Sequence, residues 1–443
     1  MRVAIELNDT AIIIHDGFQL IQKSPGYIID SAEQVWLGKD ARERAYLYSN
    51  QCENKFWSEI ARAEGNNINQ ADIKLAMRHL EDIWQHVSGQ VNTVVLIVPG
   101  TFTKTGLGLL LGICKELDIP VRAMVHQAVL CPYQLDHQGD TVNVDIQLHH
   151  TAITQLEKLG EEFVAGDTKV LHGMGLIMLY AQAAEFIAQE FIKKTRLDPM
   201  HSAELEQQLY DHLPKWLQDS QHNDVVICKL QRQNNSFEVT VNSHELHNLY
   251  EVFIDNISTT VKSICTEQNI IICLSDFIDS QFGFSRFTHK HHIKARVLDT
   301  AYYAKQSFEY NEEIFSNDDQ VYLNKQLPYT QLSDALVSTV SNDSCYEKPN
   351  HVLFCHRAYR IKDMINIVQN KQGNYELHHN QSGERDAVLT IYDNAADVCI
   401  EFDQQQEITI NERPAQSYYN LAVGDRIKIA TCEDVLTLIK VED

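Results

Sequence analysis

The residues best suited to chemistry lie in three short turns, each of which directly follows an apolar run. The first turn holds Glu6 and Thr10, the second holds Asp145 and Thr151, and the third holds Ser275. Carboxylate and hydroxyl oxygens can hold hydrated Mg²⁺, and a metal can activate water for attack on a phosphoryl group. Backbone N–H groups approach a phosphate closely only where glycine leaves room, and none of these turns contains a glycine. The turns therefore offer polar side chains to a ligand, but not the open backbone that a phosphate needs.

The composition is that of an acidic protein with more than one domain. Its 443 residues exceed the size at which one hydrophobic core stops growing, so two or three domains are expected. The 61 Asp and Glu outnumber the 37 Lys and Arg, and the formal charge of -24 disfavours nucleic acid and anionic membranes as partners. The apolar runs are too short to span a bilayer, and the alternating N-terminal strand is unlike a signal peptide. Ten cysteines without CxxC spacing predict reduced thiols and a cytoplasmic location.

The histidines do not predict a metal site. Two clusters, His149-His150 and the run from His289 to His292, have no cysteine or acidic partner at the paired spacing of structural zinc. We therefore expect surface or turn histidines and no metal. A second interpretation is that His149 and His150, when protonated, attract an anion, although an ordinary hairpin tip is favoured.

The elements that carry the three turns alternate between strands and helices along residues 1–310. Asp16-Gly17 between apolar runs predicts a hairpin within a meander over residues 1–50. Helical spacing and short buried runs predict the elements that follow. These are helices over 69–87, 104–117, 176–195, 198–217 and 245–265, strands over 94–98, 237–241 and 269–274, a strand pair over 140–159, and a strand–turn–helix over 295–308. This pattern alone indicates an α/β protein.

The order of these elements resembles the ATPase domain of DnaK-type chaperones and the wider actin and sugar-kinase superfamily. In that superfamily a βββαβα unit occurs twice, and Pro99-Gly100-Thr101-Phe102 is similar to its Pro-Ala-Tyr-Phe segment. The resemblance covers residues 1–310 and implies a two-lobed, actin-like (RNase H-like) α/β fold. It implies a first lobe over 1–135, a second over 136–315 with a return to the first near 297–313, and a linker over 316–350.

The same resemblance implies where a nucleotide would bind and which groups this chain has lost. The family's first turn, Asp-x-Gly-Thr-Thr, matches Glu6 to Thr10, with Asn8 at the glycine and Asp9 placing a negative charge where the polyphosphate belongs. Its second turn, Asp-x-Gly-Gly-Gly-Thr, matches Asp145 to Thr151, which is one residue longer. Its late Gly-Gly pair is Leu274-Ser275 in this chain, and these side chains would fill the adenosine pocket.

Under this resemblance, the residues left to hold a cofactor are Asn8, Thr10, Gly173, Gly175 and Ser275. An active enzyme would use Glu6, Asp145 and Thr151, with ATP and Mg²⁺ as cofactors. Lys55 lies near the family's catalytic lysine, but a surface lysine is the simpler interpretation. Since all three glycine signatures are absent, we expect a pseudo-ATPase without a cofactor.

Residues 351–443 predict a separate, small β-sandwich. Short β-runs recur at close spacing, with turns at Asn411-Glu412 and Gly424-Asp425. The runs at 408–411 and 421–429 resemble the second half of a forkhead-associated (FHA) domain. The Gly-Arg … Ser-Arg-x-His motif that reads phosphothreonine in that family is absent from the chain. The resemblance therefore implies the shape of such a module and not its phosphopeptide binding.

The interpretation that the sequence favours is a non-catalytic, chaperone-like scaffold or regulator that binds another protein through its C-terminal β domain. A first alternative is a divergent ATPase that uses Glu6 and Asp145 with Mg²⁺. A second is a chaperone whose β domain grips unfolded clients, although the long helical lid of that family is missing. Filament assembly, as in actin, has no sequence signal here, and the charge of -24 disfavours it at low salt.

Overall fold

The computed structural model describes most of the chain and divides it into two compact units. The described residues are 1–31, 34–65, 69–131, 139–160, 162–266, 269–285, 293–310, 313–315, 320–328, 337–338, 349–354, 357–361, 364–370, 375–379, 387–393, 398–402, 408–410, 413–414, 418–421, 425–432 and 435–441. The first unit is Met1–Val340 and the second is Ser341–Asp443. The first unit is a mixed α/β structure. Within the described residues, no helix combines the length and the apolar character needed to cross a membrane.

The first sheet of this unit has the strand order β16-β8-β7-β1-β2-β3. Its strands are β1 (Arg2–Glu6), β2 (Ile12–His15), β3 (Leu20–Ser24), β7 (Thr93–Val98), β8 (Val121–His126) and β16 (Leu323–Asn324). β1, β2 and β3 form an antiparallel meander, whereas β7 is parallel to β1 and β8 is parallel to β7. Successive side chains of a strand point to opposite faces, and β1 is buried on both, with Val3 and Ile5 in one core and Ala4 in another.

Helices cover both faces of the first sheet. α2 (Phe56–Ala61), α3 (Gln70–Gln85) and α4 (Lys104–Glu116) contribute to the core of Val3 and Ile5. α11 (Tyr302–Glu309) contributes to the core of Ala4. α3 begins where the side chain of Asn69 accepts a hydrogen bond from the Ala71 N–H, which is a typical N-cap. A small sheet of β4 (Ile28–Asp30), β5 (Val35–Leu37) and β6 (Cys52–Glu53), with α1 (Gly38–Arg42), follows the meander.

The second sheet has the order β17-β11-β10-β9-β14-β15-β18. Its strands are β9 (Asp140–Ile146), β10 (His150–Leu159), β11 (Glu162–His172), β14 (Ile270–Ser275), β15 (Ile293–Leu298), β17 (Gln326–Pro328) and β18 (Val337–Ser338). β9, β10 and β11 form an antiparallel meander, and β14 and β15 continue the sheet in parallel from β9. The sets β3-β2-β1-β7-β8 and β11-β10-β9-β14-β15 therefore have the same order and the same directions. β1 and β9 are the equivalent central strands.

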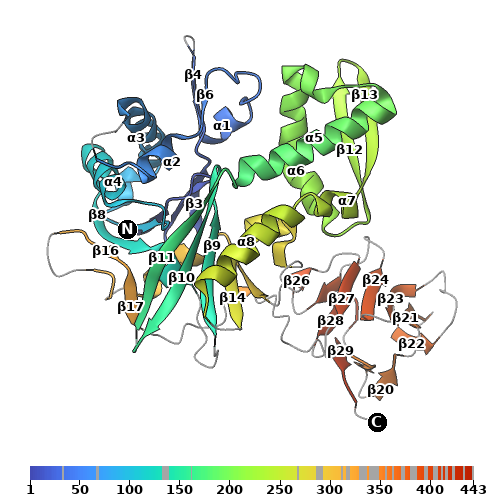
Figure 1. Cartoon of the computed structure of the whole chain (residues 1–443). Coiled ribbons are helices and arrows are strands. Elements are labelled where there is room, and N and C mark those ends of the chain that lie inside the picture. The colour runs from blue at the N-terminus through green and yellow to red at the C-terminus, as the bar shows by residue number, and fades with distance from the viewer. Residues whose placement is uncertain are drawn as a thin grey trace. The chain divides into compact units, whose positions relative to one another are not determined.

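A helical layer packs on the second sheet and carries a separate hairpin. α5 (Leu176–Thr195), α6 (Ala203–Ser220) and α8 (Glu251–Ile264) share one large core with β9 and β14. The hairpin of β12 (Val225–Arg232) and β13 (Asn235–Asn242), followed by α7 (Ser243–Asn248), packs beside α5 and α6 (Figure 1). α9 (Asp276–Phe282) follows β14 directly.

The predicted elements are present, but the structure differs from the prediction in several places. The strand β11 was not predicted. The expected helix over 245–265 is divided into α7 and α8, and Tyr250 at the break is fully buried. The strand over 237–241 pairs with β12, a partner that the sequence does not predict. The segment predicted as a linker contributes β16, β17 and β18 to the two sheets of the first unit.

The described residues of the second unit form two antiparallel sheets and include no helix. One sheet has the order β20-β19-β29-β28-β25-β26, made of β19 (His351–Phe354), β20 (Arg357–Arg360), β25 (Ile408–Ile410), β26 (Arg413–Pro414), β28 (Arg426–Ile429) and β29 (Val435–Ile439). The other has the order β22-β21-β23-β24-β27, made of β21 (Met364–Gln369), β22 (Tyr375–His379), β23 (Ala387–Asp393), β24 (Val398–Phe402) and β27 (Tyr418–Leu421). Side chains of both sheets, such as Val352 and Ile365, share one core. The predicted turns at Asn411-Glu412 and at Gly424 lie outside the described residues, whereas Asp425 lies within them.

Candidate functional site

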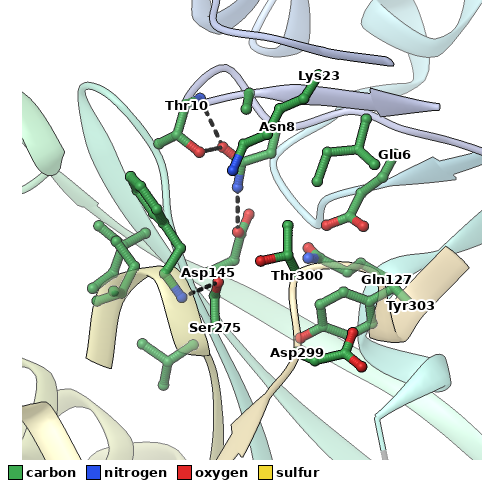
Figure 2. A pocket seen from close by; sticks show the side chains of 16 residues that line it. Glu6, Asn8, Thr10, Lys23, Gln127, Asp145, Ser275, Asp299, Thr300 and Tyr303 are labelled. Carbon is green, nitrogen blue, oxygen red and sulfur yellow. Dashed lines mark hydrogen bonds between the residues drawn. The ribbon is translucent and has the colours of Figure 1, made fainter. Parts of the chain in front are cut away.

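The three turns that the sequence singles out meet at one cavity of the first unit. The cavity measures about 620 Å³ including its open mouth. It lies at the carboxyl ends of β1 in the first sheet and of β9, β14 and β15 in the second sheet. The carboxyl ends of parallel strands lie at the same edge of their sheet, which brings these residues close together. Figure 2 shows the side chains that line it, among them Glu6, Asn8, Thr10, Asp145 and Ser275. Five of the eight residues predicted for catalysis or cofactor binding are thus brought together.

Asp145 is linked to the first turn by a hydrogen bond between side chains. Asn8 Nδ2 donates to Asp145 Oδ1 at 2.7 Å, and Gln147 Nε2 donates to Asp145 Oδ2 at 2.7 Å. Asn8 Oδ1 in turn accepts from the N–H and the hydroxyl of Thr10, at 2.8 and 2.6 Å. The backbone of Asn8 is not left-handed, so its side chain, and not a glycine-like conformation, shapes the first turn. Burial raises the pKa of Asp145 to about 6, although the amide donors oppose the shift.

Asp9 bonds directly to the backbone of the second turn. Its Oδ1 accepts from the Leu148 N–H at 2.6 Å, and its Oδ2 is buried without a hydrogen-bond partner among the described residues. Only 3% of Asp9 is exposed, and burial raises its pKa to about 7 against the opposing effect of the Leu148 N–H. The Asp9 carboxyl group therefore accepts a hydrogen bond from the Leu148 N–H, which a phosphate oxygen would need as its donor.

The second turn is also closed from its other side, by the N-terminus of α5. The first N–H groups of a helix have no partner within the helix. Here the Leu176 N–H donates to Gln147 O at 2.8 Å, and the Ile177 N–H donates to Leu148 O at 3.1 Å. A Cβ at Gly175 would lie 2.4 Å from Leu148 O and 2.6 Å from His150 N, so glycine is needed for this approach. The helix N-terminus thus binds the turn itself.

The remaining predicted site residues do not line the cavity. Thr151 is buried, and its hydroxyl donates to Met174 O at 2.6 Å, which fixes the segment before α5. Gly173 has a φ of 72° and allows the turn into that segment, while Gly175 makes the close approach to the second turn. Thr151, Gly173 and Gly175 therefore stabilise the second turn and its packing against α5. Lys55 is exposed, as predicted.

The two histidines of the second turn are not surface residues available to an anion. His149 Nε2 lies 3.1 Å from Asn54 O and 3.0 Å from Asn54 Oδ1, and His150 is buried with 1% exposed. Burial lowers the pKa of both, to about 4 for His150. They are therefore neutral near pH 7. They lie at the tip of the β9–β10 hairpin, as the favoured prediction has it, although His150 is buried. The cluster from His289 to His292 lies outside the described residues.

Sequence reasoning missed five polar residues of the cavity: Lys23, Gln127, Asp299, Thr300 and Tyr303. Lys23 Nζ lies 5.0 Å from the ring centroid of Phe277. Asp299 Oδ2 lies 2.9 Å from Lys305 Nζ, and the Tyr303 hydroxyl donates to Asn143 Oδ1 at 2.7 Å. Asp299-Thr300 directly follows the predicted strand at 295–298, so its place at the end of a parallel strand was the signal that could have found it.

The cavity residues do not fit ATP and Mg²⁺. Among the described residues, no group of three or more His, Cys, Asp or Glu side chains is placed to hold a metal ion. Burial, with repulsion from Asp145, raises the pKa of Glu6 to about 8. The backbone donor of the second turn at Leu148 is already bonded to Asp9.

No protein-family model matches this sequence, and a search of curated proteins finds no match to it.

Proposed function

We propose that this protein is a non-catalytic relative of the actin and DnaK-type ATPases that serves as a scaffold or regulator. Two sheets with the same strand order, each a meander followed by parallel strands, support membership of that two-lobed, RNase H-like fold. The cavity at the ends of the central strands β1 and β9 lies where such a fold would hold its nucleotide. The altered turns at this cavity support the loss of that nucleotide.

The observation that carries the proposal is the hydrogen bond from the Leu148 N–H to Asp9. In this bond the first turn supplies a carboxylate oxygen, and the second turn supplies the backbone donor that would otherwise face a phosphate. The α5 N-terminus, which is a second source of phosphate-binding N–H groups, is bonded to Gln147 and Leu148. Asp9 and the carbonyl groups of Gln147 and Leu148 therefore accept the hydrogen bonds that a phosphate would otherwise accept.

Further contacts hold the two lobes together away from the cavity. Gln207 Oε1 on α6 accepts from the Tyr46 N–H at 2.9 Å, and Gln207 Nε2 donates to Arg42 O at 3.1 Å. The rings of Tyr46 and Tyr210 stack with centroids 3.9 Å apart. Residues 323–328 pair with β8 of the first sheet and with β11 of the second. Such contacts favour a fixed scaffold over a lobe that opens and closes with each nucleotide.

The partner proposed for this scaffold is another protein, bound through the β domain. The two antiparallel sheets of the second unit are compatible with the FHA-like sandwich that the sequence resembles. The structure includes no disulfide among the cysteines that it describes, which agrees with a proposed cytoplasmic location.

The test is isothermal titration calorimetry of ATP and ADP, with and without Mg²⁺, on the full-length chain. We expect no binding heat and no thermal stabilisation at millimolar nucleotide. Micromolar, magnesium-dependent binding would overturn the proposal.

A second candidate, a divergent ATPase, is favoured by one observation. Glu6 and Asp145 both line the cavity, as an active member of the family would require. This candidate predicts ATP hydrolysis that is abolished in Asp145→Ala and retained in a variant of an exposed carboxylate such as Glu53→Gln. Absence of hydrolysis in the unmodified chain would rule it out.

A further inference from the structure

We propose that the cavity between the two turns binds a small organic cation, an alkylguanidinium or alkylammonium group, with Glu6 as its principal partner. Three carboxyl groups, those of Glu6, Asp145 and Asp299, line this cavity. Lys23 is the one Lys or Arg side chain among the lining residues that the structure describes. When Glu6 is ionised, above its raised pKa of about 8, the three carboxylates outnumber the one lining Lys side chain, and this excess of negative charge suits a cation and not a nucleotide.

Glu6 is the group that points to a ligand. The residue is 7% exposed, and its Oε2 is buried without a hydrogen-bond partner among the described residues. Figure 2 shows its carboxyl group turned into the cavity, toward Gln127 and Thr300. A buried polar atom without a partner is costly, and native proteins usually satisfy such atoms. A donor brought by a ligand would satisfy it.

The other carboxyl groups supply charge and already have their hydrogen-bond partners. Asp145 accepts from Asn8 and Gln147. Asp299 accepts from the Ala301 N–H at 2.8 Å and lies 2.9 Å from Lys305 Nζ. Glu6 is therefore the carboxyl group of the cavity that can accept a hydrogen bond from a new donor.

The cavity already binds one cation of the chain itself. Lys23 Nζ lies over the face of Phe277, at 5.0 Å from the ring centroid, and both residues line the cavity. An aromatic face attracts cations. The ammonium group of Lys23 is therefore held by the ring, and it makes no ion pair with Glu6 within the described residues.

The chemistry of the lining favours an organic cation over a metal ion. No three potential metal ligands converge among the described residues, whereas Ile13, Val144 and Ile278 offer an apolar wall to an alkyl stem. A guanidinium group has a planar fork of donors that matches a carboxylate. The same group is available from a free metabolite or from an arginine side chain of a protein.

The experiment uses butylguanidinium as the probe, with butylurea as its neutral isostere and acetyl-Gly-Arg-Gly-amide as a peptide carrier of the same group. Binding to the full-length chain is measured by calorimetry at pH 8.5. The variant is Glu6→Gln, and the matched control is Glu53→Gln, which removes an exposed carboxylate of β6. We expect butylguanidinium to bind and butylurea not to bind. The loss of one charge-assisted hydrogen bond should weaken binding in Glu6→Gln by about 10- to 100-fold.

The peptide distinguishes the two sources of the cation. Binding of both butylguanidinium and the peptide supports an arginine side chain as the ligand, and binding of butylguanidinium alone supports a free cation. Equal binding of butylguanidinium and butylurea, or no binding of either guanidinium probe at 10 mM, would overturn the proposal. So would unchanged affinity in a folded Glu6→Gln variant. None of these results bears on ATP, so the scaffold proposal stands or falls separately.

Discussion

The turn after β1 and the turn after β9 occupy equivalent places in two sheets of the same order, yet they are held in opposite ways. The first is held by its own side chains, with Asn8 bonded to Thr10. The second is held through its backbone, which binds α5 on one side and Asp9 on the other. Between the two, Asp9 of the first turn accepts from the Leu148 N–H of the second, and Asn8 of the first turn donates to Asp145 at the end of β9. The difference teaches that two turns without glycine can bind each other directly.

The largest expected effect concerns Glu6, at the start of the first turn. Its pKa is about 8 in the folded protein against an ordinary value of 4.5, so the folded state binds more protons than the unfolded state between these values. Stability therefore falls as pH rises through this window, by up to about 1.4 kcal/mol per pH unit for this group. Glu6→Gln should remove that loss and be more stable than the unmodified chain by about 5 kcal/mol at pH 9, with little difference at pH 4.5.

Urea unfolding at pH 4.5, 7 and 9 measures this effect, with Glu53→Gln as the control. Equal stability of Glu6→Gln and the unmodified chain at pH 9 would show that Glu6 does not titrate as a buried group. The carboxyl group of Glu6 would then be accessible to water in the folded protein, and the first turn would be open.

The second prediction concerns the backbone contacts of the second turn. In Gly175→Ala the new Cβ would lie 2.4 Å from Leu148 O, so α5 and the turn must move apart. Such overpacking should cost about 2–3 kcal/mol of unfolding free energy. Gly173→Ala is the matched control, because no described atom lies within 4 Å of its Cβ and its φ of 72° costs about 1–2 kcal/mol. A smaller loss for Gly175→Ala than for Gly173→Ala would contradict the close contact.

The third prediction tests the bond between the turns. Asp9→Ala leaves the Leu148 N–H without its acceptor and should cost about 2 kcal/mol. Asp9→Asn retains an acceptor oxygen and removes a buried charge, so it should cost less than Asp9→Ala at pH 8. Thermal unfolding of both variants measures these losses of stability. An equal cost for both would mean that the hydrogen bond contributes nothing.

The smallest expected effect lies at the contact between Gln207 and residues 42–46. Gln207→Ala removes hydrogen bonds to Tyr46 and Arg42 and should cost about 1 kcal/mol. Gln208→Ala is the control, since the side chain of Gln208 bonds to Gln231 of β12 and not to residues 42–46. Limited proteolysis would detect opening of the lobes in Gln207→Ala. Equal protease resistance of the two variants would show that this contact does not hold the lobes together.

The sequence predicted much of the cavity because its residues follow buried strands. Glu6, Asp145 and Ser275 each end or directly follow an apolar run, and such residues gather where strands of one sheet end. The sequence did not predict that Thr151 turns to Met174 O, because that bond depends on how β11 leads into α5. It also missed β12, since Val225 and Ile227 are exposed and obscure the alternation of its buried residues.

Amide hydrogen exchange at Leu148, Leu176 and Ile177, with and without millimolar MgATP, tests the central comparison most directly. These three N–H groups are bonded to Asp9, Gln147 and Leu148. If the turns bind each other in place of a nucleotide, all three amides should exchange slowly in the free protein and at the same rate with MgATP present. Fast exchange in the free protein that becomes slow with MgATP would show that the N–H groups still serve a phosphate, and that the site has not been lost.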